Sequence, residues 1–149
     1  MIMVKTKKKQ IIGRREIVGF PELGLDRIVA KIDTGAYTSA LYCHDIREEN
    51  GILIFKLLSP AYTIYNSKEH RYTNYGRKEI KNSFGEIENR FTINTIIIIG
   101  GIKIKSVISL TDRSAMRYPV LIGRKILKNR FVVDVSLPAT ISSVQVKHT

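Results

Sequence analysis

An acidic triplet that directly follows an apolar strand is the part of this sequence best suited to chemistry. The strand segment 28–32 runs into Asp33-Thr34-Gly35, with Ala36 next. A strand that ends at Asp33 places the carboxylate at its end, where a cleft can open. Gly35 lets backbone N–H groups approach the carboxylate, and the Thr34 hydroxyl can bond locally to hold the loop. These residues fit one half of a site in which two carboxylates share a proton and activate a water molecule.

A matching element lies ninety positions farther along the chain. The apolar residues 120–122 lead into Gly123 and Arg124, and 124–129 is the one convincing helix in the sequence, a turn or two long. A site of this kind needs a second segment that passes beside the acidic loop, and such a segment consists of a strand, a glycine and a short helix in this order. The alternative interpretation of Asp33-Thr34-Gly35 is a simple turn, in which an aspartate bonds its own backbone.

The remaining pattern is mostly strand. Gly100-Gly101 joins two long strands and is a strong hairpin signal, and Ser83-Phe84-Gly85 turns one strand into the next. The stretch 62–75 has four tyrosines among polar residues, and we expect a loop or an irregular insert there. The predicted strands are 11–20, 27–32, 51–58, 78–82, 86–99, 102–110 and 131–135. Many short strands in a small chain indicate a mainly β fold, either a barrel or a sandwich.

Length and composition set the general class. The 149 residues suffice for one domain, 1–149, with a real core, and the hydrophobic content is 44%. No apolar run is long enough to span a membrane, and the N-terminus has no signal-peptide pattern. Cys43 is the only cysteine, which excludes an internal disulfide and fits a reducing compartment. We therefore expect a cytoplasmic protein that does not bind a membrane.

The charge is strongly positive. Lys and Arg number 25 against 13 acids, which gives a net charge of +12. Residues 1–15 and 113–130 each hold six bases and no acid. Such a field attracts polyanions, whether nucleic acid, anionic lipid or an acidic peptide. The alternative is an ordinary lysine-rich solvated surface without a partner.

These segments resemble a known family. The triplet with Ala36, the central hairpin and the strand–glycine–helix element resemble the retropepsins, which are single-lobed aspartic peptidases. More closely, the sequence is similar to bacterial proteins labelled ATP-dependent zinc proteases, some of which sit beside RimK-type glutamate ligases. The resemblance runs from about 12 to 134 and rests on segments 31–36, 38–41, 81–86, 110–113 and 118–134, with Glu88 and Arg90. It implies a closed retropepsin-like β-barrel with one short C-terminal helix.

The resemblance also implies roles for residues. Asp33, Thr34 and Gly35 would be catalytic. The tip of a hairpin, here Ser83-Phe84-Gly85, would cover the bound peptide as a flap. Substrate-binding positions would be Ala36, Ser83, Phe84, Gly85, Ile122, Gly123 and Arg124. Viral retropepsins place an acid two residues after the glycine to pair with the arginine of the crossing segment. Tyr37 stands there in this chain, so the partner of Arg124 is left open. Members of the bacterial group usually carry a His-Ala pair where this chain has Tyr42-Cys43.

The chain holds a single triplet of this kind, because Asp45, Asp112 and Asp134 lack the context. The second carboxylate must therefore come from Asp33 of another copy across a two-fold axis, which predicts a homodimer. A groove between two basic subunits favours acidic peptides, and the proximity of family members to glutamate ligases points toward glutamate-rich ones. No cofactor is predicted.

Other functions remain open at this point. A retropepsin-shaped module without activity could bind RNA, with Tyr72 and Tyr75 near basic residues stacking bases, although nucleic acid is not the expected partner. A zinc-dependent peptidase is the reading that the family label offers. However, the chain has no His-Glu-x-x-His and no phosphate-binding loop, and the neighbours Cys43 and His44 point to opposite faces of a strand. We therefore predict no metal site. A purely structural or interaction role, with Asp33 as a turn residue, is the last alternative.

Overall fold

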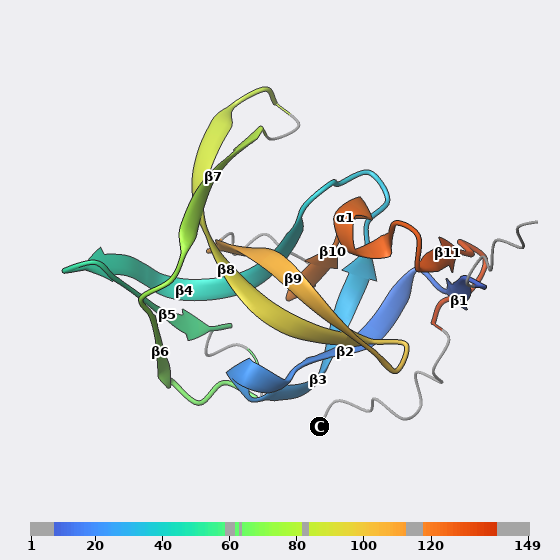
Figure 1. The fold of residues 1–149 in the computed structure, drawn as a ribbon, viewed down its shortest axis with the longest axis horizontal. Coiled ribbons are helices and arrows are strands. Elements are labelled where there is room, and N and C mark those ends of the chain that lie inside the picture. The colour runs from blue at the N-terminus through green and yellow to red at the C-terminus, as the bar shows by residue number, and fades with distance from the viewer. Residues whose placement is uncertain (1–7, 59–61, 63, 82–83, 113–117, 140–149) are drawn as a thin grey trace, which may run out of the picture.

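The structure is a computed structural model, which describes residues 8–58, 62, 64–81, 84–112 and 118–139. Strands dominate these residues, which include one short α-helix and one 3₁₀ turn (Figure 1). The elements in chain order are β1 (Gln10–Ile12), β2 (Arg15–Phe20), the 3₁₀ helix η1 (Pro21–Leu23), β3 (Leu25–Ile32), β4 (Ser39–Glu49), β5 (Ile52–Leu57), β6 (Glu69–Tyr72), β7 (Gly76–Lys81), β8 (Ile87–Ile99), β9 (Ile102–Thr111), β10 (Val120–Ile122), α1 (Arg124–Leu127) and β11 (Phe131–Val133).

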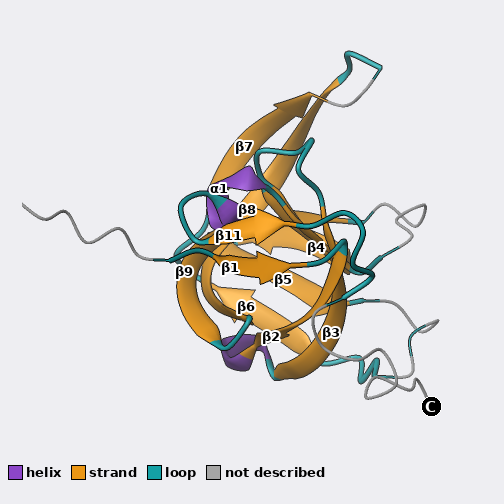
Figure 2. Cartoon of the chain, turned by 90° about the vertical axis from the view of Figure 1, so that its right-hand side faces the viewer, coloured by secondary structure: helices purple, strands orange, loops and turns teal. Residues whose placement is uncertain are grey.

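Six strands close into a barrel. The hydrogen-bonded order runs β10-β3-β2-β8-β9-β4, and β10 pairs again with β4, which closes the circle. The turned view shows the strands curving around a common interior (Figure 2). β5 and β6 extend the sheet beyond β4, β7 pairs with β8, and β1 and β11 form a separate parallel pair. The prediction of a mainly β, closed retropepsin-like barrel with one short C-terminal helix is confirmed.

The β8–β9 hairpin follows directly from its sequence. Gly100 and Gly101 both adopt positive φ, +58° and +77°, which lets the chain reverse tightly between Ile99 and Ile102. On β9, buried Ile104 and Ile108 lie on the face opposite the exposed lysines. The predicted hairpin at Gly100-Gly101 is confirmed.

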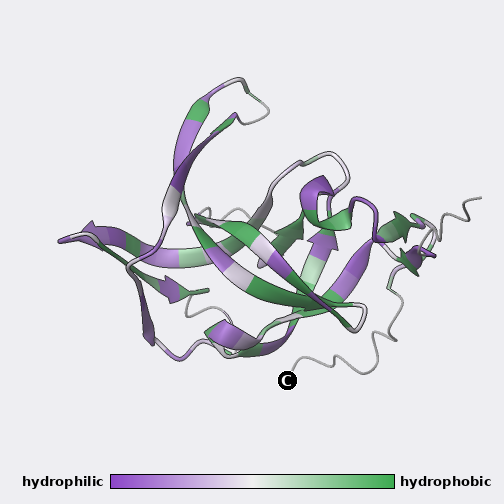
Figure 3. Ribbon diagram, in the orientation of Figure 1, coloured by the Kyte–Doolittle hydropathy of each residue, from purple (hydrophilic) through white to green (hydrophobic). Residues whose placement is uncertain are grey.

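The hydrophobic core fills the barrel. Figure 3 shows hydrophobic residues along β8 and β9 where they cross the barrel, and hydrophilic residues along β7. Burial of this apolar surface is the main source of stability in such a domain. The largest fully buried side chains are Phe20, Phe55, Ile12, Leu41, Leu53, Ile54, Leu58, Ile93, Ile97, Ile99, Ile108 and Ile122. No helix among the described residues is long and apolar enough to cross a membrane.

Three parts of the strand prediction differ from the structure. The longest strand missing from the predicted set is β4, Ser39–Glu49, of which only the pair Cys43-His44 was assumed to lie on a strand. Its first five residues are all buried, because β9 and β10 flank it within the barrel, so it lacks the alternation that marks a half-exposed strand. The expectation of a loop across 62–75 is wrong for β6, which pairs with β5. The predicted strand 11–20 is divided into β1 and β2 at Gly13-Arg14.

Candidate active site

Asp33 lies immediately after β3, at the rim of the barrel. Its backbone N–H donates to the carbonyl oxygen of Ile122 at 2.8 Å, which ties the end of β3 to the end of β10. The Gly35 N–H donates to Asp33 Oδ1 at 3.0 Å, and the Ala36 N–H donates to the Asp33 carbonyl at 3.2 Å. Asp33 is half-buried, whereas Thr34 and Gly35 are exposed. The carboxylate is therefore held in place by its own loop while the loop itself faces outward.

Gly123 lets the crossing segment pass directly against this loop. A Cβ on Gly123 would lie 2.6 Å from the carbonyl oxygen of Thr38 and 2.7 Å from that of Tyr37. The Gly123 N–H donates to Ser39 Oγ at 2.9 Å in a buried environment. In turn the Ser109 hydroxyl donates to the Ser39 carbonyl at 3.0 Å. Because no side chain fits between the two segments, the glycine is a steric requirement of this crossing.

The start of α1 is fastened to the same loop. The backbone N–H groups of Arg124 and Lys125 donate to the carbonyl oxygens of Ala36 and Tyr37, at 2.8 and 3.0 Å. These bonds satisfy amide groups at the helix start that have no partner within the helix. The loop that carries Asp33 is thus fixed at both ends, by β10 on one side and by α1 on the other.

Arg124 has two partners in this loop, which answers the question that the sequence left open. Its guanidinium donates to the Thr34 carbonyl at 3.0 Å and lies over the Tyr37 ring, with 5.8 Å between Cζ and the ring centroid. This distance is within the range of a cation–π contact. A carbonyl and an aromatic face thus take the place of the acid that the retropepsin comparison led us to look for.

The hairpin of β7 and β8 projects from the barrel on the side of the β3–β4 loop (Figure 1). Phe84 near its tip is 87% exposed and Ile87 is 67% exposed, so two large apolar side chains face outward there. Gly85 adopts a positive φ of +81°, as a tight turn requires. Ser83 lies outside the described residues. The tip of the hairpin therefore presents apolar side chains to solvent.

The base of the hairpin is anchored to β4. Arg77 forms an ion pair with Glu48 at 2.5 Å, and the Tyr75 hydroxyl donates to the same carboxylate. Arg77 also lies 5.2 Å from the centroid of the Phe91 ring. The hydrogen bond from Tyr75, followed by that from Arg77, lowers the pKa of Glu48 below its ordinary value. The base of the hairpin is therefore tied to β4.

A basic groove of about 660 Å³ opens beside Asp33. Strand register places Arg15 opposite Lys31, and Lys31 opposite Leu121, so three adjacent strands contribute to one wall. Arg14 lies next to them, and none of the three cations forms an ion pair among the described residues. The residues that line the groove are Arg14, Arg15, Lys31, Ile32, Asp33, Tyr118 and Leu121. The surroundings of Asp33 are thus electropositive.

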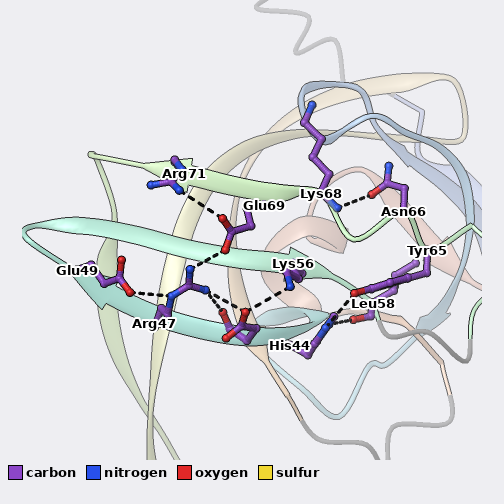
Figure 4. A network of polar contacts seen from close by, with 11 residues as sticks. His44, Arg47, Glu49, Lys56, Leu58, Tyr65, Asn66, Lys68, Glu69 and Arg71 are labelled. Atoms are coloured by element: carbon purple, nitrogen blue, oxygen red, sulfur yellow. Dashed lines mark hydrogen bonds and ion pairs between the residues drawn. The ribbon is translucent and has the colours of Figure 1, made fainter.

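A separate polar network, which does not include Asp33, lies along β4, β5 and β6 (Figure 4). Arg47 forms ion pairs with Asp45, Glu49 and Glu69 at 3.1, 2.9 and 2.6 Å. The hydrogen bond from Arg47 is the largest cause that lowers the pKa of Glu69. His44 contacts the Leu58 carbonyl through Nδ1 at 2.5 Å. This network ties the three strands together.

The residues considered for RNA stacking have partners inside the protein. Tyr72 stacks on Phe55 with 5.7 Å between ring centroids, and Tyr75 bonds to Glu48. Arg71 pairs with Glu69 at 3.3 Å. Tyr72 and Tyr75 therefore contact neighbouring strands, and Arg71 pairs within its own strand, β6.

For a metal, the described part of the chain offers no group of three His, Cys, Asp or Glu side chains close enough to bind one ion. Cys43 is fully buried, and burial raises the pKa of its thiol well above the ordinary value. His44, its neighbour on β4, points elsewhere and contacts Tyr65, with 3.3 Å between Nε2 and the hydroxyl. The zinc alternative therefore has no ligand set in this region.

The residues predicted for the site thus fall into two groups. Asp33 to Ala36 and Ile122 to Arg124 meet at the rim of the barrel, and the side chain of Ile122 is fully buried, so it acts on the site through its carbonyl. Phe84 and Gly85 lie on the projecting hairpin. Sequence reasoning missed Tyr37, Ser39 and the cations of the groove. Their contribution depends on strand register and on the crossing at Gly123, which no local pattern reveals.

Comparison with known proteins agrees with this geometry. The sequence model of a family described as "Retropepsin-like aspartic endopeptidase RimB" matches residues 11–143. A similar solved structure is that of a Legionella pneumophila protein of unknown function, with a TM-score of 0.66 and 25% identity, covering 89% of this chain and 98% of that one.

Curated relatives are longer. A protein of Shewanella halifaxensis named "Probable alpha-L-glutamate ligase" is 36% identical over 138 residues, which are 86% of this chain and 29% of the relative. A Desulfotalea psychrophila protein of the same name is 29% identical over 143 residues, which are 91% of this chain and 30% of the relative. The chain therefore spans less than a third of the length of these relatives.

Proposed function

We propose that this chain, which belongs to the RimB-like family of retropepsin-like aspartic endopeptidases, hydrolyses peptide bonds as a homodimer in which each subunit supplies one Asp33 carboxylate. The observation that carries the proposal is the Asp33 loop. Its carboxylate is held by the Gly35 N–H, its backbone is tied to β10, and its residues Thr34 and Gly35 face outward. One such loop is half of an acid–base pair.

The missing half would come from a second copy. A two-fold axis near the β3–β4 loop would bring two identical Asp33 carboxylates together, because an isologous interface contacts itself. Two carboxylates at such close range cannot both ionise, so they would share one proton and titrate as a unit. The ionised member would take a proton from water while the protonated member polarised the scissile carbonyl. The apolar hairpin tip at Phe84 would cover the bound peptide.

Acidic peptides, including glutamate-rich ones, are the substrates that the charge favours. Arg14, Arg15 and Lys31 line the groove beside Asp33 without acidic partners among the described residues. Guanidinium groups bind carboxylates in bidentate fashion, and the net charge of +12 adds long-range attraction. The names of the longer relatives, which refer to a glutamate ligase, agree with this choice. We place the activity in the cytoplasm, because a reducing compartment keeps a lone cysteine such as Cys43 in the thiol form.

The test is cleavage of a glutamate-rich peptide by the wild-type protein and by Asp33→Asn. Asp26→Asn is the matched control, because Asp26 is an exposed aspartate on β3, the strand that leads into Asp33. We expect Asp33→Asn to abolish cleavage and Asp26→Asn to preserve it, with a statine-type transition-state mimic inhibiting and a chelator having no effect. Cleavage that survives in Asp33→Asn, or that a chelator abolishes, contradicts the proposed mechanism.

The substrate preference needs a separate test. If the groove binds acidic side chains electrostatically, the affinity for a glutamate-rich peptide must fall as salt is added, and fall more than that for a neutral peptide. Arg15→Gln should reduce this salt dependence. Equal salt dependence for both peptides would contradict the preference and leave the catalytic proposal standing.

A further inference from the structure

We propose that Tyr37 is a positioning residue that couples the β7–β8 hairpin to the loop carrying Asp33. Its ring contacts two cations that come from different parts of the chain. Lys78 on β7 places Nζ 5.6 Å from the ring centroid, and Arg124 on α1 places Cζ 5.8 Å from it. The inference deepens the proposed function and rests on it for the role of the hairpin as a substrate cover.

The backbone of Tyr37 is held in place, which limits where its ring can lie. The Tyr37 carbonyl accepts from the Lys125 N–H at 3.0 Å, and the close passage of Gly123 leaves no room for this segment to shift. Arg124 also donates to the Thr34 carbonyl, one residue after Asp33. Tyr37 therefore lies in the same loop as Asp33, and Arg124 links its ring to the Thr34 backbone of that loop.

Lys78 makes the connection to the hairpin. It lies on β7 directly opposite Arg90 of β8, so the side chains of the two residues lie on one face of the hairpin. Because Lys78 reaches the Tyr37 ring, this face is turned toward the Asp33 loop. The base of the hairpin is held separately by Glu48, so the Lys78–Tyr37 contact is a second attachment closer to the tip.

The chemistry explains why a tyrosine serves at this position. An aspartate would attract both cations, but it would offer them two oxygens at one point, whereas the two negative faces of a ring can each accept a cation. Tyr37 is 51% exposed, so each contact is of the weaker, solvated kind. A contact of this strength changes an opening equilibrium about two- to fivefold. Such a contact favours the closed position of the hairpin but still allows it to open.

Amide hydrogen exchange of the 149-residue chain, without substrate, tests the coupling. We expect Tyr37→Leu and Lys78→Met each to increase exchange in 76–81 and 87–92 about two- to fivefold, and the double variant to add little more. Tyr37→Phe, which keeps the ring, should retain wild-type exchange. Lys103→Met is the matched control, since Lys103 is an exposed lysine on β9.

Two results would overturn the inference. One is unchanged exchange in both Tyr37→Leu and Lys78→Met, and the other is equal acceleration in Tyr37→Phe and Tyr37→Leu. Because exchange is measured without turnover, failure of the coupling is separate from failure of the proposed peptidase, which Asp33→Asn decides. The hairpin can prove uncoupled in an active enzyme, and coupled in an inactive one.

Discussion

Replacement of Gly123 by alanine tests the tightest contact in the site. The new Cβ would lie 2.6 Å from the Thr38 carbonyl oxygen and 2.7 Å from the Tyr37 carbonyl oxygen. Both atoms belong to the backbone, so neither can rotate away, and the segments must separate. The Gly123 backbone, at φ −94° and ψ 178°, is extended and acceptable to alanine, so the cost is steric. Overpacking of this kind costs about 1–3 kcal/mol.

Urea unfolding of Gly123→Ala beside Gly35→Ala measures this cost. In Gly35→Ala the new Cβ meets only Asp33 Oδ1, at 3.3 Å, and that side chain can shift. We therefore expect Gly123→Ala to lose about 1–3 kcal/mol of unfolding free energy, and Gly35→Ala to lose less. Separation of the crossing should also displace Asp33 and reduce cleavage. A Gly123→Ala protein as stable as wild type would refute the close passage on which the site is built.

Three further predictions concern buried or half-buried polar groups. Ser39→Ala should cost about 1–3 kcal/mol in urea unfolding, because the buried Gly123 N–H loses its acceptor, and a cost near zero would contradict that bond. Burial, and secondly the positive charge of Lys68, lower the pKa of His70, so the unfolded chain binds the proton more readily than the folded one. The wild type should therefore lose unfolding free energy relative to His70→Phe as the pH falls below about 6.5. Parallel curves of unfolding free energy against pH would contradict this. The Cys43 thiol is buried with a raised pKa, so a thiol reagent should label the protein only on unfolding, and rapid labelling of the native form would contradict its burial.

The β8–β9 hairpin could be predicted because its signals are local. Glycines at positive φ mark the turn, and a period-two pattern marks at least one strand. β4 could not be predicted in the same way. Its start is buried throughout, since its neighbours are β9 in parallel and β10 in antiparallel, and both come from distant parts of the chain. Local periodicity carries no information about such a strand.

The candidate site shows the same division. Asp33 and Gly123 were predicted because the signals are local. An apolar strand leads into the Asp33 turn, and another leads into Gly123 and the short helix. The position of Lys31 beside Arg15 depends instead on the register between β2 and β3. The partners of Arg124 depend on where Tyr37 lies after the loop closes. These contacts arise from the closure of the barrel, which a single sequence does not specify residue by residue.

The proposed peptidase requires two Asp33 carboxylates, one from each of two copies, to act together. Mixing wild-type protein with Asp33→Asn in equal amounts, with time for subunits to exchange, tests this claim. Random exchange leaves about one quarter of the dimers with two aspartates, so the cleavage rate per wild-type chain should fall to about one half. A rate per wild-type chain that stays unchanged at every mixing ratio, after exchange has been shown with labelled subunits, would contradict the shared dyad.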